Sequence, residues 1–250
     1  MEEKLLRMKD FVEVRAELLS HLEIEDRLVG SSIVYLPLGA LEFHGPHLPT
    51  GLDGLTAHGI CAAAARLSGG VVLPTMYQGT GGEHSDYPWT LMMPSGQAIA
   101  ENILAMLRRL DALGVKTAVM LSGHFADEQR AMLKEIAINW SKDRSMTMRV
   151  ITRTVADCDV APVAPDHAGV FESLLLAAIH PDLVNVSKLP ELSNNPSIDP
   201  EGNKFGSHRH SPNHALWGVF GPDPREIDID KSAELFEVLV AWLSSLGSKG

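Results

Sequence analysis

The sequence predicts an α/β protein in which buried strands alternate with amphipathic helices along the chain. Short β-branched apolar runs bounded by Gly or Pro, such as Ile33–Leu38, are typical of buried strands. Longer segments with apolar residues at helical spacing, such as Ala98–Leu113, alternate with these runs. With 250 residues, 45% of them hydrophobic, the chain can bury a sizeable core. We therefore expect a single domain over residues 1–250, with an extended loop at about 190–215.

The predicted elements follow one another without an internal repeat. Residues 2–29 have apolar side chains at roughly helical spacing and carry no evident chemistry. Gly and Pro punctuate the rest of the chain, and Ser68-Gly69-Gly70 is a typical helix end. The further predicted strands cover residues 71–73, 116–121 and 148–155, with a last strand and turn within 216–224, and the further predicted helices cover residues 55–67, 98–113, 129–140, 174–179 and 231–246.

A polar loop rich in Gly and Pro follows the first predicted strand. It carries Glu42, His44, His47 and Asp53. Ligands bind at the carboxyl edge of the sheet in open α/β proteins, so this loop lies where a site is expected. Carboxylates and imidazoles together suit Zn²⁺, Mn²⁺ or Fe²⁺. Any one of these residues alone is more often a solvated loop side chain, but the cluster favours a metal site.

Two later strand–helix junctions repeat this pattern. His124 follows the predicted strand 116–121, and it can reach the first loop if strands 33–38 and 116–121 are neighbours in a parallel sheet. His167 and Glu172 precede another helix, where Glu172 is alternatively a first-turn carboxylate favoured by the helix dipole. Three such junctions seldom arise by chance, so we expect all three to contribute to one site.

A Gly-rich loop at residues 78–85 ends in Glu83 and His84. Glu83 would repel an anion and no phosphate-binding pattern is present, so we expect these two side chains to face substrate or support ligands. Tyr87 and Trp89 either wall a pocket or cap the core.

The long polar segment at 190–215 contains three histidines. A loop of this length is usually a lid, a partner arm or a disordered segment. Most histidines in such a loop bind no metal, although a His-x-His pair can do so. The three residues are His208, His210 and His214.

Composition narrows the classes of partner and compartment. A formal net charge of −11 argues against nucleic acid or an anionic membrane surface as a partner. The two cysteines form no CxxC motif, and a disulfide framework is implausible in a chain of this length, so we expect a cytoplasmic protein. We detect no signal peptide and no apolar stretch long enough to span a bilayer.

The string LPLGALEFHGPHLPTGLD, residues 36–53, resembles the signature of the creatininase (creatinine amidohydrolase) family. Weaker pieces follow in the family's order, and together they cover roughly residues 31–240. These pieces are Gly79 with Glu83-His84, Ser122-Gly123-His124, His167-Ala168-Gly169 with Glu172-Ser173, and Gly218–Gly221.

The resemblance implies a three-layer α/β/α fold with a mostly parallel central sheet. It also implies a dinuclear site with two divalent ions (Zn, Mn or Fe) and hydrolysis of amide-type C–N bonds other than peptide bonds, in cyclic amides or formamides. By motif position, Glu42 and His124 bind one metal, His44 binds the other and Asp53 bridges both. A homo-oligomer, often a hexamer in this family, is expected, with a small polar molecule as substrate.

Two departures from the family's pattern put creatinine itself in doubt as the substrate. Creatininases have a Glu ligand where this chain has Ala126, so another acid must complete the second metal. Glu172 is the first candidate and Glu128 the runner-up. Trp89 replaces a Gly of the family and would change the shape of the substrate pocket, to which we also assign Glu83, His84 and Phe125.

In the expected mechanism, metal-activated water attacks the carbonyl and an acid–base group protonates the leaving nitrogen. His167 is the leading candidate for that group, and Glu172 shares the task if Glu128 is the metal ligand. Two alternatives remain open. The same metal site could hydrolyse a lactone or the ring diketone of a keto-sugar, or the chain could be a non-catalytic descendant that binds a metal or ligand.

Overall fold

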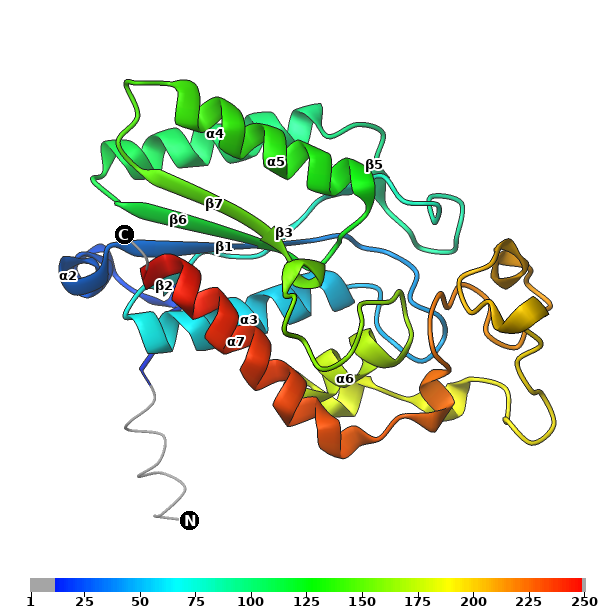
Figure 1. The fold of residues 1–250 in the computed structure, drawn as a ribbon. Helices are drawn as coiled ribbons and strands as arrows, with labels where there is room; N and C mark the ends of the chain where they lie inside the picture. The colour runs from blue at the N-terminus through cyan, green and yellow to red at the C-terminus, as the bar shows by residue number, and fades with distance from the viewer. Residues whose placement is uncertain (1–11, 249–250) are drawn as a thin grey trace, which may run out of the picture.

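A computed structural model describes residues 12–248, and Figure 1 shows a central sheet between two layers of helices. The strands pair in the order β2-β1-β6-β7, with β3 also beside β1, and every pair is parallel. The five strands of the sheet are β1 (Ile33–Gly39), β2 (Val71–Val72), β3 (Met76–Tyr77), β6 (Thr117–Ser122) and β7 (Arg149–Thr154).

Helices cover both faces of this sheet. Helices α4 (Gln97–Ala112) and α5 (Asp127–Lys142) pack on one face. Helices α3 (Leu52–Ser68), α6 (Val170–Ile179) and α7 (Ser232–Ser248) pack on the other. The three-layer α/β/α fold with a parallel central sheet is therefore confirmed.

The central strand β1 has no charged residue and is mostly apolar because both of its faces are buried. All seven residues of β1 are buried. Val34 and Leu36 pack towards α4 and α5, whereas Tyr35 between them packs towards α3 and α7. Helix α2 (His21–Ser31) lies at the periphery, with Ile24 and Leu28 packed against the α4/α5 layer.

Neighbouring parallel strands bring two of the predicted polar loops together. Leu38 near the end of β1 pairs with Ser122 at the end of β6, and the Gly123 amide donates to the Leu38 carbonyl at 2.9 Å. Glu42 and His124 follow these two strand ends within a few residues. The expected parallel neighbourhood of the two strands is thus confirmed.

The first turn of α3 packs directly on both strand ends. A Cβ atom on Gly39 would lie 2.6 Å from the Gly54 Cα, and one on Gly123 would lie 2.6 Å from the Asp53 Cα. Glycine at both positions therefore lets the backbone of α3 approach the sheet and fixes the place of Asp53.

Several sequence expectations need correction. The predicted strand at 216–224 is absent from the described structure, and only Phe220 pairs there, in an isolated bridge to His167. Gly218 and Gly221 adopt positive φ angles that break a regular strand on either side of Phe220. Within 12–29 only a 3₁₀ turn and most of α2 are helical, and residues 2–11 lie outside the described part of the chain. Two short strands not foreseen, β4 (Gly79–Thr80) and β5 (Met92–Met93), pair in parallel.

The segment 190–215 is irregular but folds around a buried arginine. Arg209 is 0% exposed, and its Nη1 donates to the Val219 carbonyl at 2.9 Å. Its Nε and Nη2 donate to both Asp199 oxygens, at 2.7 and 2.9 Å. This paired guanidinium holds the pKa of Asp199 well below its usual range. Across residues 12–248 no helix is long and apolar enough to cross a membrane.

We predict that Gly39→Ala lowers the free energy of unfolding by about 1–3 kcal/mol, because the added Cβ must push the backbone of α3 away from the sheet. Gly30→Ala is the matched control. No atom lies within 4 Å of its added Cβ, and Ala is favoured over Gly inside a helix by about 0.5–1 kcal/mol. Urea unfolding in the presence of chelator measures both variants, and equal midpoints would contradict the packing argument.

Candidate metal centre

Five side chains from four segments converge at the carboxyl edge of the sheet. Glu42 and His44 come from the loop after β1, and Asp53 comes from the first turn of α3. His124 comes from the loop after β6, and Glu172 comes from the first turn of α6. All five are buried. The residues that the sequence analysis assigned to one site therefore lie together.

A first group of possible metal ligands, called donors below, consists of His124, Glu42 and Asp53. The His124 Nδ1 lies 2.9 Å from Glu42 Oε2 and 3.6 Å from Asp53 Oδ2. Its Nε2 lies 3.2 Å from the Thr80 carbonyl, an acceptor, so Nε2 carries the proton. The Nδ1 lone pair of a neutral His124 therefore faces the two carboxylates, as in histidines that bind metals.

A second group consists of His44, Asp53 and Glu172. The His44 Nδ1 donates to the Glu42 carbonyl at 3.0 Å, which leaves Nε2 to face Asp53 Oδ1 at 3.3 Å and Glu172 Oε2 at 3.5 Å. That Nε2 is buried and makes no hydrogen bond within the described structure. In a neutral His44 this Nε2 would aim a buried lone pair at two carboxylates, which is costly without a proton or a metal ion between them, so this set of side chains fits a divalent metal.

Asp53 lies between the two groups. Its Oδ1 faces His44 and its Oδ2 faces His124, while the Ala40 amide donates to Oδ2 at 3.1 Å. One carboxylate oxygen is thus directed at each group, as a bridging ligand requires.

The pKa values reflect this concentration of negative charge. Burial alone lowers the pKa of His44, but the carboxylates of Glu172 and Asp53 outweigh burial and raise it to about 10. Burial likewise opposes the charged form of His124, yet its bond to Glu42 raises the pKa to about 9. Burial raises the pKa of Glu172 well above its usual value, and His44 offsets this only in part. In the protein without metal, protons on His44 and His124 therefore supply the positive charge that a metal ion would otherwise bring.

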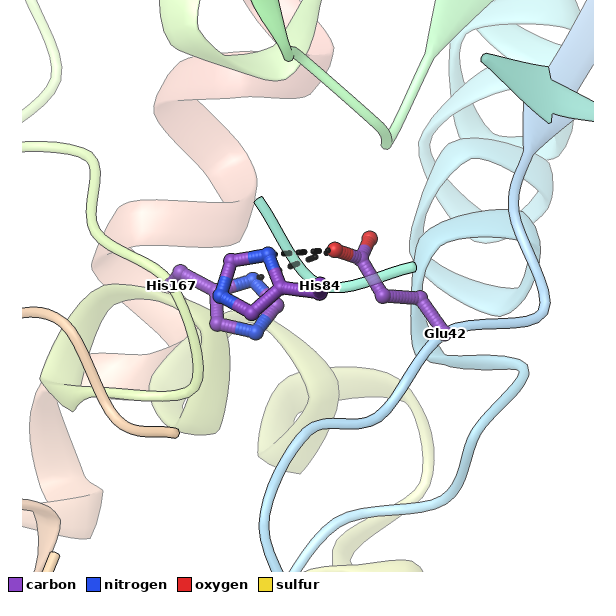
Figure 2. A group of neighbouring side chains, drawn as sticks. All are labelled: Glu42, His84 and His167. Carbon is purple, nitrogen blue, oxygen red and sulfur yellow. Dashed lines mark ion pairs between the residues drawn. The ribbon is translucent and has the colours of Figure 1, made fainter. Parts of the chain in front are cut away.

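A pair of stacked imidazoles borders Glu42 on its other side (Figure 2). The His84 and His167 rings lie 4.0 Å apart, and the His84 Nδ1 is 3.0 Å from Glu42 Oε1. The His167 Nε2 donates to the Phe43 carbonyl at 2.9 Å, so its Nδ1, 4.0 Å from Glu42 Oε1, is the free position. Burial holds the pKa of His167 well below its usual value. His167 is therefore neutral and able to accept a proton at Nδ1.

These side chains enclose a small cavity of about 280 Å³. Among the described residues that line it, none is Lys or Arg, so the charge on its walls is negative. The cavity holds a small polar molecule or the reacting end of a larger one. Besides Glu42, Asp53, His124, Glu172 and the histidine pair, its walls contain Gly82, Phe125, Ala126 and Asp127.

The residues assigned to the substrate pocket divide between this cavity and the surface. His84 and Phe125 line the cavity. Trp89 is absent from its walls and is 82% exposed, because its backbone turns through a left-handed conformation with φ 58°. The Glu83 side chain is 85% exposed and pairs with the His210 Nε2 at 3.3 Å. Glu128, the runner-up ligand, is exposed and accepts a bond from the Gly82 amide at 3.2 Å, outside the donor cluster.

His47 has a supporting role that its position in the sequence could not reveal. Its Nε2 donates to the Ala168 carbonyl at 3.0 Å, and the Ala168 amide donates to Glu172 Oε2 at 2.6 Å. Ala168 itself has φ 56°, unusual for a residue with a side chain. His47 thus holds the strained peptide that orients Glu172 and adjoins His167. The His-x-x-His spacing was visible in the sequence, but the contact spans 121 residues.

The three histidines of the 190–215 segment lie apart from the donor cluster. His210 Nδ1 is 2.8 Å from the Tyr87 hydroxyl near the cavity. His208 and His214 approach Asp199 at 2.9 and 3.9 Å. That carboxylate already accepts two bonds from Arg209, so these contacts are explained by local folding of the segment.

Comparisons with known proteins agree with the fold and the site. The family model of Creatininase, described as creatinine amidohydrolase, matches residues 17–246. The chain is 26% identical over 194 residues to the creatinine amidohydrolase of Pseudomonas putida, an alignment that covers 68% of this chain and 74% of that protein. It is 29% identical over 163 residues to the mycofactocin precursor peptide peptidase of Mycolicibacterium smegmatis, covering 63% of this chain and 62% of that protein.

Solved structures support the same assignment of the fold. A crystal structure of creatinine amidohydrolase has a TM-score of 0.77 at 22% identity and covers 94% of this chain and 97% of that one. Two further creatininase structures, with TM-scores of 0.76, are described as a Mn form and as a variant of Zn-Zn type.

Fold and site together define a three-layer α/β hydrolase with a buried cluster of carboxylates and imidazoles. Since the family model covers nearly all of the described residues, the chain belongs to the creatininase family. This membership confirms the predicted enzyme class, a hydrolase that acts on amide-type C–N bonds.

We predict that adding Zn²⁺ to the metal-free protein at pH 7.5 releases at least about two protons per chain. His44 and His124, with pKa values of about 10 and about 9, are protonated at that pH and must lose their protons to bind metal. Apparent affinity therefore rises with pH up to that range. Calorimetric titrations in buffers of different ionisation enthalpy count the protons.

The control for this titration is His44→Gln, which should release about one proton fewer. Release of less than one proton by the unsubstituted protein would contradict the charge state described above.

Proposed function

We propose that this protein is a hydrolase with two divalent metal ions that cleaves an amide-type C–N bond, a cyclic amide or a formamide, in a small polar molecule. The observation that carries the proposal is the position of Asp53, whose two oxygens face two separate histidines. The unpartnered Nε2 of His44 supports the same reading.

In this proposal Glu42 and His124 bind one ion, His44 and Glu172 bind the other, and Asp53 bridges them. Glu172 is favoured over Glu128 because its carboxylate lies 3.5 Å from the His44 Nε2, whereas Glu128 is exposed. Glu172 thus replaces the ligand that is missing at Ala126. The Mn and Zn-Zn creatininase structures support a divalent metal of this kind.

Bound divalent ions supply an activated water at neutral pH and a Lewis acid for the substrate carbonyl. The chain's own residues move the proton. Neutral His167, fixed by its bond to the Phe43 carbonyl, accepts the proton of the attacking water at Nδ1. It then returns that proton to the leaving nitrogen, so that the departing group is a neutral amine. Burial excludes bulk water from this transfer.

The named relatives support amide chemistry, and they act on different molecules according to their descriptions. Ala126 lines the cavity here, and its small side chain supports a substrate other than creatinine. A homo-oligomer, a hexamer by family resemblance, stays a prediction, as do iron as the metal and a cytoplasmic location.

A panel of cyclic amides and formamides, each with a matched lactone, tests the proposed reaction on the metal-replete protein. We expect turnover of at least one compound, giving formate and an amine from a formamide or a ring-opened amino acid from a cyclic amide. Hydrolysis of lactones alone, or of no compound by a fully metallated protein, would contradict the proposal.

Asp53→Ala should lose both metals together and lower kcat/KM by roughly 10³-fold, because it removes the carboxylate shared by the two groups. Elemental analysis after purification without chelator measures the metal content. Asp182→Ala, which removes an exposed carboxylate, should change neither quantity. A variant at position 53 that retains a full metal complement would show that Asp53 does not bridge.

His167→Ala should keep its metals but lower kcat by about 10²–10⁴-fold, the usual contribution of a positioned acid–base group. The pH profile should also lose the limb that reports this group. His21→Ala removes an exposed histidine from α2 and serves as the control. Unchanged kcat in the His167 variant would assign the proton transfer to another residue.

A further inference from the structure

A second and larger cavity opens beside the metal centre. This groove, of about 900 Å³, lies between α4, α5 and the segment that contains β4 and β5. It has more than three times the volume of the metal cavity. A small amide would occupy the metal cavity alone, so the reaction at the metal centre leaves the groove unexplained.

Only a thin wall separates the two cavities. Gly81 lines the groove and Gly82 lines the metal cavity. On the facing helix, Glu128 lines the groove and Asp127 lines the metal cavity. The Gly82 amide donates to Glu128 Oε2 at 3.2 Å, which ties the two sides together. The groove therefore begins directly beside the metal cavity, on the far side of the single Gly82–Glu128 hydrogen bond.

The groove has an apolar floor and an acidic rim. Met132 and Ile136 are buried in the floor, beside the half-buried Leu104 and the two methionines of β5, Met92 and Met93. Methionine side chains adapt to flexible apolar ligands.

All charged residues among the described lining of the groove are acidic. They are exposed, and none of the lining residues is Lys or Arg. An anionic ligand would be repelled, whereas a cation is attracted to the rim. These residues are Glu101, Glu128 and Glu135.

We propose that the groove binds the remote part of the substrate, an unbranched apolar chain that ends in an amine. This inference rests on the proposed reaction, and it replaces the small polar substrate named there by a long-chain amide with a cationic end. The apolar floor receives the chain and the carboxylate rim receives the ammonium group. Asp127 lines the metal cavity, and exposed Glu83 lies between Gly82 and His84, which also line it. Both carboxylates add negative charge that repels anions.

Charge also decides against a two-fold symmetric dimer across the groove. In a two-fold symmetric dimer the same patch meets itself. The three rim carboxylates would then face their own counterparts, on a protein that already carries a net charge of −11. A cationic ligand relieves this repulsion.

A series of N-formyl-α,ω-diaminoalkanes tests the inference through catalysis. Hydrolysis of each gives formate and a diamine, and the matched N-formylalkylamines lack the cationic end. We expect kcat/KM to rise roughly twofold to fourfold per added methylene once the chain enters the groove. Ala100→Trp, which fills the groove from α4, should reduce kcat/KM for long members more than for the shortest one. Glu234→Gln on α7, an exposed carboxylate outside the groove, is the control.

Binding measured without turnover separates this inference from the proposed function. In protein labelled with ¹³C at the methionine methyls, octylamine should shift the signals of Met92, Met93 and Met132, and octanoate at equal concentration should not. Ala100→Trp and Glu135→Gln should weaken this response, whereas Glu234→Gln should leave it unchanged.

Groove shifts without hydrolysis of any formamide would leave the groove assignment standing and overturn the proposed reaction. Hydrolysis that is independent of chain length, with no octylamine shifts, would overturn the groove assignment alone. If the methyl signals of Met92, Met93 and Met132 shift with protein concentration but not with octylamine, the groove is a subunit interface. That result would also overturn the groove assignment.

Discussion

The placement of the Asp53 carboxylate between two histidines is the constraint on which the rest of the structure depends. Its oxygens face His44 and His124 at 3.3 and 3.6 Å, although these histidines follow different strands. That arrangement needs β1 and β6 as parallel neighbours, and it needs the first turn of α3 in backbone contact with both strand ends. Glycine at positions 39 and 123 permits the contact. The sheet order, the helix packing and the donor cluster therefore form one geometric unit.

The charges of this unit explain why it fits metal ions. Three buried carboxylates without a neighbouring Lys or Arg, among the described residues of the cavity, destabilise a protein that holds no compensating charge. Protons on His44 and His124 supply that charge in the absence of metal, and divalent ions would supply more of it. Contacts around the site hold these side chains directed towards one another despite the repulsion between the carboxylates. The chain from His47 through the Ala168 peptide to Glu172 is one example, and the bridge between His167 and Phe220 is another.

The sequence predicted those parts of the protein that local patterns encode. The apolar runs of β1 and β6 and the polar residues that follow them identified the sheet edge and gathered Glu42, Asp53 and His124, whose ligand roles stay predictions. Local patterns carry no information about contacts between distant segments, so the role of His47 and the folding of residues 190–215 around Arg209 were missed. The expected strand within 216–224 was wrong, since each of the two apolar pairs there is followed by a glycine at positive φ. Trp89 lies outside the cavity because a left-handed turn, invisible in the sequence, sets its direction.

The shared carboxylate is the central claim, and anomalous X-ray diffraction at the zinc edge tests it most directly. Crystals of the zinc-loaded protein should show two strong anomalous peaks per chain, with one oxygen of Asp53 on each ion. His124 and Glu42 should contact one peak, and His44 and Glu172 the other. A single peak, or two peaks of which Asp53 contacts only one, would contradict the account.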